Sequence, residues 1–131
     1  MASKTDQTQI LSVTGVANGA SATSSIYNVS TAIASEIEVI VSTSSAPDPN
    51  QGANVVIEAY SSQDGTNVSV VPFYSTTIYP DTTSYRVVLE LPDADILSMK
   101  YYQIKVTNNL VDSDGNGLSA DFTVNAIQTT W

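Results

Sequence analysis

The feature that most constrains this chain is an alternation of apolar and polar residues, which turn residues interrupt at roughly eight- to twelve-residue intervals. In residues 85–91, for example, Tyr85, Val87 and Leu89 alternate with polar neighbours such as Arg86. A period of two places successive side chains on opposite faces of a β-strand. The pattern therefore predicts an all-β fold, a single antiparallel two-sheet β-sandwich of immunoglobulin-like or jelly-roll kind with about eight strands.

Residue usage favours the same fold class. The chain has 15 Val and 10 Ile against only 6 Leu, and branched side chains suit a pleated strand better than a helix. Its 131 residues are enough for one domain. We expect a flexible N-terminal arm over residues 1–9 and a single β-sandwich domain over residues 10–131.

The expected strands are separated by Gly, Pro, Asn and Asp. Asp64-Gly65 predicts a hairpin between two of them, and Pro72 predicts an edge position or a bulge. Residues 44–53 predict a long exposed loop, and residues 92–99 predict one helical turn. The strands are expected at residues 10–16, 25–29, 36–43, 54–61, 68–74, 77–79, 85–91, 100–107 and 118–127.

The composition argues against several classes of function. The chain has no His and no Cys, which removes the commonest general base and any thiol nucleophile or thiolate ligand. Its net charge of -9, with four scattered basic residues, argues against nucleic-acid binding. No segment approaches the run of about 20 apolar residues that spans a membrane. The sequence therefore predicts a protein that is not an enzyme.

One segment has part of a calcium-binding pattern. Asp112, Asp114 and Asn116 are spaced two apart and Gly117 follows, as at the start of an EF-hand loop. The Glu that should close the loop is missing, because Thr123 stands at its position. A plain polar turn is the favoured interpretation, so we expect either no cofactor or weak calcium binding at these three residues.

The aromatic residues are candidates for an interface. Neighbouring residues on a strand point to opposite faces, so one of Tyr101 and Tyr102 must face out of the core. Tyr and Trp are enriched at protein interfaces. We therefore select Tyr74, Tyr101, Tyr102 and the terminal Trp131 as candidate interface residues.

Three segments in order resemble a known group of proteins. The run "NVVIEAYSSQDGTN", the later "SYRVVLELPDAD" and then "MKYYQIKVTNN" resemble the small β-sandwich virion structural proteins of tailed bacteriophages. The resemblance covers roughly residues 25–127. The hairpin in that group often continues with a Trp, where this chain has Val68.

The resemblance implies a non-enzymatic bacteriophage virion structural protein, most specifically a capsid decoration or cement protein on the outside of the head. The implied partners are the major capsid protein or other virion proteins, together with further copies of this chain in a homo-oligomer. Its place would be the virion, after synthesis in the bacterial host cytoplasm. The alternatives are a neck, tail or baseplate component and, in a different class, a calcium-dependent carbohydrate-binding or adhesion module.

Overall fold

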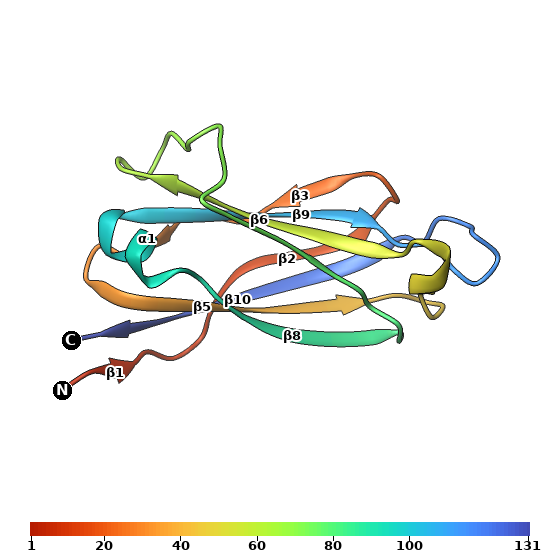
Figure 1. Ribbon diagram of the computed structural model, residues 1–131, viewed down its shortest axis with the longest axis horizontal. Helices are drawn as coiled ribbons and strands as arrows, with labels where there is room; N and C mark the ends of the chain where they lie inside the picture. The colour runs from red at the N-terminus through yellow and green to blue at the C-terminus, as the bar shows by residue number, and fades with distance from the viewer.

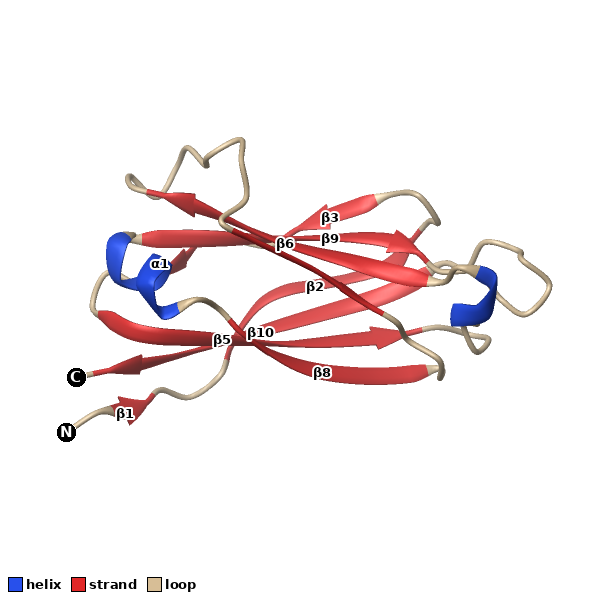
Figure 2. Cartoon of the chain, viewed as in Figure 1, coloured by secondary structure: helices blue, strands red, loops and turns tan.

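A computed structural model describes residues 1–131 as ten strands, one α-helix and one 3-10 helix (Figure 1; Figure 2). The two helices are short and lie between strands, so the molecule is almost entirely β-structure, as the residue usage predicts. The elements in chain order are β1 (Ser3–Lys4), β2 (Thr8–Val16), β3 (Ser21–Thr23), β4 (Tyr27–Asn28), β5 (Ala32–Ser42), η1 (Pro49–Gln51), β6 (Asn54–Ser62), β7 (Tyr74–Ile78), β8 (Ser84–Glu90), α1 (Asp93–Ser98), β9 (Tyr101–Asn109) and β10 (Ala120–Thr130).

The strands form two antiparallel sheets that pack face to face, which confirms the predicted β-sandwich. In the β10 sheet, β5 joins β10 to β8, and the other edge of β10 pairs with β2 and then β1. In the β9 sheet, β6 joins β9 to β7, and the other edge of β9 pairs with β3 and then β4. The open edges on one side of the sandwich are therefore β7 and β8.

The order of pairing selects the jelly roll from the two expected alternatives. The pairs are nested: β2 pairs with β10, β3 and β4 with β9, β5 with β8, and β6 with β7. The chain is thus one long hairpin that wraps on itself, which is the arrangement of a double-sheet jelly roll. The loop between β6 and β7 is the tip of that hairpin.

The core lies between the sheets and follows the predicted alternation. On β10, Phe122, Val124 and Ala126 are buried, whereas Asp121 is exposed. β5, β6 and β9 contribute further alternate residues to one continuous cluster of buried side chains. Tyr85, Val87 and Leu89 on β8 face the same way but stay half-buried, since β8 is the last strand of its sheet.

Two buried polar groups hold the sheets together across this core. The Tyr102 hydroxyl on β9 lies 2.8 Å from the Ser35 hydroxyl on β5, and Ser35 donates to the Ile127 carbonyl on β10, also at 2.8 Å. Burial raises the pKa of Tyr102 above its ordinary value, against the opposing effect of the Ser35 hydrogen bond. Tyr102 therefore stays neutral and joins the two sheets through a hydrogen bond.

The Asn108 side chain makes the second link, toward the far end of the sandwich. Its amide nitrogen donates to the carbonyls of Val16 and Leu118, each at 2.8 Å, and its oxygen accepts from the Leu110 N–H at 2.8 Å. Every amide hydrogen and the amide oxygen thus have a partner although Asn108 is completely buried. A buried amide with all partners present fixes the relative position of its strands.

One expectation about the middle of the chain is wrong and another is confirmed. Residues 68–74 are not a strand, because β7 begins only at Tyr74 and the preceding residues form a loop. Asp64-Gly65 does turn the chain back, with Gly65 at φ +77°, and β6 and β7 pair antiparallel as the predicted hairpin. Between them only the Ser69 and Phe73 N–H groups bond to the backbone of β6, at the Ser61 and Ala59 carbonyls, before the ladder begins at Tyr74. Pro72 explains the late start, because it has no N–H to give to a ladder.

The ends of several other elements also differ from expectation. Residues 25–29 contain only β4, and β3 precedes them, because this part of the chain pairs with β9 in two short pieces. The segment 1–9, expected to be a flexible arm, includes β1, which pairs with the end of β10. Its mobility stays a prediction. The helical turn expected at residues 92–99 is confirmed as α1.

Candidate interaction surface

Several exposed apolar side chains belong to one end of the sandwich. The loop 63–73, helix α1 and the C-terminus all lie at the end that carries both chain termini (Figure 1). Within these segments Val70 is 93% exposed, Val71 68%, Leu97 63% and Trp131 84%. We call the loop 63–73, α1 and Trp131 the terminal end. Four largely exposed apolar side chains at one end of the sandwich make that end a candidate protein contact surface.

The loop 63–73 is held in a defined shape by Asp64. One Asp64 oxygen accepts the N–H groups of Thr66 and Asn67, each at 2.8 Å, and the other accepts the Asn67 amide at 3.0 Å. The Ser62 hydroxyl adds a longer contact of 3.3 Å. These hydrogen bonds, first of all that from the Asn67 N–H, lower the pKa of Asp64 well below its ordinary value.

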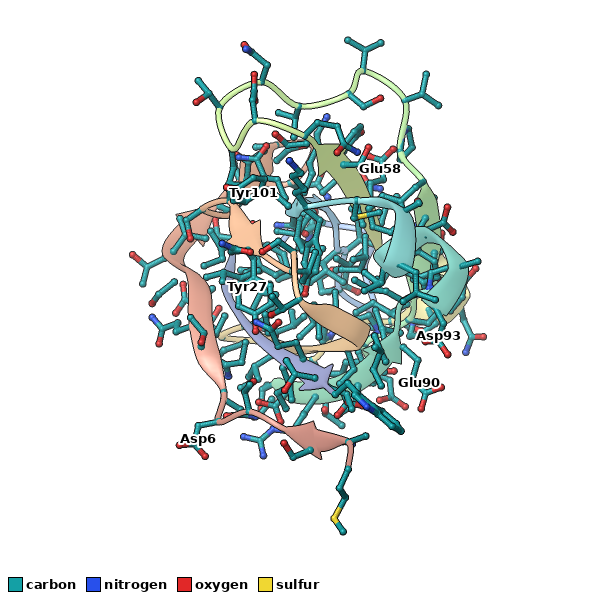
Figure 3. The ribbon with its side chains drawn as sticks, turned by 90° about the vertical axis from the view of Figure 1, so that its left-hand side faces the viewer. Asp6, Tyr27, Glu58, Glu90, Asp93 and Tyr101 are labelled. Atoms are coloured by element: carbon teal, nitrogen blue, oxygen red, sulfur yellow. The ribbon has the colours of Figure 1, made fainter.

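Tyr101 supports the same loop from below. A Cβ placed on Gly65 would lie 3.2 Å from Cζ of the Tyr101 ring, so the ring packs directly against the turn. Figure 3 looks onto the terminal end and shows the loop above Tyr101. Gln63 also reaches α1, where its amide lies 3.5 Å from the Ser98 carbonyl. The loop and the helix are therefore connected parts of one surface.

The structure changes the set of candidate interface aromatics. Trp131 is exposed and Tyr101 is half-buried beneath the loop. Tyr74 is half-buried and packs against the core. Tyr102 has no exposed surface, so its selection as an interface residue is wrong. Alternation requires one tyrosine of the pair to face inward, and the hydrogen bond to Ser35 satisfies the hydroxyl of Tyr102 in the core.

Val70, Val71 and Leu97 were not expected at this surface. Residues 68–74 were interpreted as a strand, and a strand would have turned one of the two valines inward. The sequence "SVVPF" contains the signal that favours a loop over a strand here. Two adjacent Val cannot share one face of a strand, and the Pro that follows cannot donate to a ladder.

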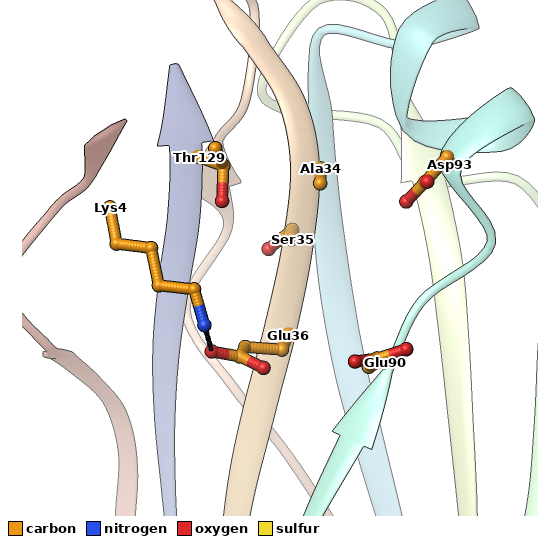
Figure 4. A pocket seen from close by; sticks show the side chains of 7 residues that line it. All are labelled: Lys4, Ala34, Ser35, Glu36, Glu90, Asp93 and Thr129. Carbon is orange, nitrogen blue, oxygen red and sulfur yellow. Dashed lines mark hydrogen bonds and ion pairs between the residues drawn. The ribbon is translucent and has the colours of Figure 1, made fainter. Parts of the chain in front are cut away.

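The structure has two hollows, and neither suits an apolar ligand. The first, of about 180 Å³, is lined by Lys4, Ala34, Ser35, Glu36, Glu90, Asp93 and Thr129 (Figure 4). The second lies near the other end and has no apolar lining residue. Small-molecule sites are mostly apolar with a few placed polar groups.

No helix of this chain has the length and apolar character needed to cross a membrane.

The loop selected for calcium binding is a closed turn. Oδ1 of Asp112 accepts the N–H groups of Asp114 and Asn116, each at 2.9 Å, and the Asp112 N–H donates to the Asn116 carbonyl at 2.9 Å. No three His, Cys, Asp or Glu side chains in the structure are grouped to hold a metal ion. Calcium binding by Asp112, Asp114 and Asn116 stays a prediction.

Comparison with known proteins gives a fold but no family. No family model and no curated sequence matches this chain. Among solved structures, the prophage-derived protein YomS of SPBc2 has a TM-score of 0.51 at 14% identity, over 99% of this chain and 96% of its own. The PBSX exported protein XepA has a TM-score of 0.55 at 7% identity, over 96% of this chain. A chain of the T13 IBDV viral particle has a TM-score of 0.51 at 11% identity, over 98%.

The extent of these matches differs. This chain spans 37% of XepA and 35% of the IBDV chain, but nearly all of YomS. At such low identities the likeness concerns the fold alone. Proteins derived from phages and a protein of a virus particle therefore share this β-sandwich.

A first prediction concerns the Asp112 turn. Asp112→Ala removes the acceptor of two backbone N–H groups, so we expect the free energy of unfolding to fall by about 1 kcal/mol. Asp112→Asn keeps an acceptor oxygen and should lose much less. Urea unfolding of the three proteins measures the difference.

Calorimetry on wild type, Asp112→Asn and Asp114→Asn separates a turn from a metal site. A plain turn predicts no heat on calcium titration and the same melting temperature in calcium and in chelator. A calcium-dependent rise in melting temperature that both Asp112→Asn and Asp114→Asn weaken would show that the loop binds the metal.

A second prediction concerns the pH dependence of stability. Asp64 has a lowered pKa in the folded chain, so its carboxylate stabilises the fold above the ordinary value of 3.8, and this is lost as the pH falls further. Asp64→Asn cannot titrate. We expect wild type to be more stable than the variant above about pH 5 and the gap to shrink toward pH 2. A gap that does not change over this range would contradict the assignment.

Proposed function

We propose that this chain is a non-enzymatic structural protein of a bacteriophage particle, most specifically a decoration or cement protein that binds the outside of the capsid. Its partners are the major capsid protein or other virion proteins, and it acts as a homo-oligomer. The protein is made in the cytoplasm of the bacterial host and carried in the virion.

The observation that carries this proposal is the terminal end. It presents Val70, Val71, Leu97 and Trp131 to solvent on a chain whose net charge is -9. Asp64 and Tyr101 hold the turn at the start of the loop that bears the two valines. On either side of the valines, the Ser69 and Phe73 N–H groups donate to the Ser61 and Ala59 carbonyls, each at 2.9 Å. A preordered apolar surface loses little conformational entropy on binding, which suits an adhesive function.

The fold supports the proposal by analogy. Jelly rolls are common in viral capsid domains, although a fold alone does not determine a function. YomS, described as prophage-derived, matches this chain over nearly the full length of both proteins. The absence of His and Cys removes the residues on which most catalytic sites rely.

The close alternative is a neck, tail or baseplate component of the same particle. Symmetry separates the two, because a capsid coat follows the many local axes of the head and a tail component follows one axis. Quantitative mass spectrometry of purified particles gives the copy number relative to the major capsid protein. A ratio near a simple fraction of that protein supports decoration, a few copies per particle support the tail, and no copies contradict the proposal.

A third prediction tests the terminal end directly. Val70→Asp and Leu97→Asp should each weaken binding to particles that lack the chain by about tenfold or more, because a charge replaces an apolar contact. Tyr79→Asp is the control, since this exposed residue follows β7 and lies outside the terminal end. Co-sedimentation with particles measures affinity, and thermal melting confirms that each variant folds. Equal loss in all three variants would exclude the terminal end as the contact.

A further inference from the structure

The strand β8 is an open edge with free backbone groups. It ends the β10 sheet, and only β5 pairs with it (Figure 1). The Leu91 N–H donates to the Ser35 carbonyl, and the Thr43 N–H donates to the Thr83 carbonyl. Bonded and non-bonded pairs alternate along an antiparallel ladder, so the odd-numbered residues of β8 bond to β5. The N–H and C=O groups of Arg86, Val88 and Glu90 therefore point to the open edge.

The side chains of the same three residues form a self-complementary pattern. Arg86, Val88 and Glu90 are all exposed on the outer face of the sheet, and Val88 is 54% exposed. One basic and one acidic residue stand at equal distances on either side of an apolar residue. When a second copy of the segment lies antiparallel and is centred on Val88, the basic residue of each copy stands opposite the acidic residue of the other.

Glu90 also lacks a cation within its own chain. It lies directly opposite Glu36 in the ladder between β5 and β8, and like charges in that position repel. The Lys4 ammonium nitrogen lies 2.9 Å from a carboxylate oxygen of Glu36 and neutralises it, whereas Glu90 has no ion pair (Figure 4). Arg86 contacts Glu38 through one nitrogen at 3.5 Å and is largely exposed. Its guanidinium keeps further donors for a second carboxylate.

We propose that two copies of this chain pair through β8, antiparallel and about a two-fold axis at Val88. In this register Arg86 stands opposite the partner's Glu90, Glu90 opposite the partner's Arg86, and the two Val88 side chains meet. All three pairs join residues with free backbone groups, so each exchanges two hydrogen bonds. Val87 stands opposite the partner's Leu89, and the two sheets become one.

Neighbouring registers satisfy fewer groups. An axis at Arg86 would place the two guanidinium groups against each other, and one at Val87 would leave both charges without an opposite partner. The other open edge, β7, has no charged residue between Tyr74 and Ile78 to select a register. An isologous contact requires a patch that complements itself, and β8 meets that requirement whereas β7 does not.

The net charge sets the conditions of the test. Two copies at -9 each repel one another at low salt. At about 0.15 M ionic strength the screening length is about 8 Å, so the distant charges are largely screened and the close pairs across the edge are less affected. Sedimentation velocity at this ionic strength, over a range of protein concentrations, measures the monomer–dimer equilibrium.

Charge variants supply a test that folding defects cannot imitate. Arg86→Glu places acids opposite acids and Glu90→Arg places bases opposite bases, so each variant alone should be monomeric. Mixed together they should form a heterodimer, because every pair is again opposite in charge. The double variant with both substitutions should dimerise by itself. Wild type that stays monomeric, or single variants that dimerise as wild type does, would overturn the proposal.

The backbone contact has its own variant. Val88→Pro removes an N–H that points to the open edge and not to β5, so the fold should survive while dimerisation is lost. Val88→Thr keeps the N–H and should still dimerise. Circular dichroism confirms folding. A Val88→Pro variant that is folded and dimeric would exclude this edge.

Pairing through β8 is expected of the purified chain by itself. Only the use of the dimer in a virus particle rests on the proposed function. Failure of the pairing can therefore be told apart from failure of the virion proposal. A monomeric chain that is still found on particles would exclude β8 pairing alone. A dimer that is absent from particles would exclude the virion function alone.

Discussion

The buried amide of Asn108 is the contact on which the end of the sandwich away from the termini depends. It binds the Val16 carbonyl of the opposite sheet, the Leu118 carbonyl in the connection that leads into β10, and the Leu110 N–H just after β9. Removing such a group would leave several buried backbone atoms without partners, at a cost of about 1–3 kcal/mol each. Nearer the termini, Tyr102 and Ser35 connect the same two sheets. With both links in place, the edges and loops can present exposed groups without loosening the core.

The period of two was enough to predict the sandwich, because it fixes which side chains of β5, β6, β8, β9 and β10 face inward. It could not choose the jelly roll, since strand order depends on long-range pairing that no local pattern encodes. Asn108 was missed for a related reason. Asn108 continues the buried face of Tyr102, Ile104 and Val106. A polar residue at such a position predicts the end of a strand as long as its hydrogen-bond partners are unknown.

The candidate surface was predicted less well than the fold. Trp131 was selected as a candidate interface residue without deciding whether it is buried; the structure exposes it, and its contact stays a prediction. Tyr102 was selected wrongly, although its alternation with Ile104 and Val106 already places it on the apolar, buried face of β9. Val70 and Val71 were assigned to a strand, although Pro72 prevents a ladder there. The exposure of Trp131, by contrast, depends on how the end of the chain packs, which no local pattern encodes.

The central claim is that this chain is a rigid two-sheet unit that attaches to a particle through its terminal end and leaves β8 free to pair with another copy. A cryo-electron microscopy reconstruction of the native particle tests it most directly. The account predicts density for the chain outside the capsid shell, with the loop 63–73, α1 and Trp131 against the neighbouring protein and two copies joined at β8. Density in which the terminal end points into solvent, or a particle without the chain, would contradict it.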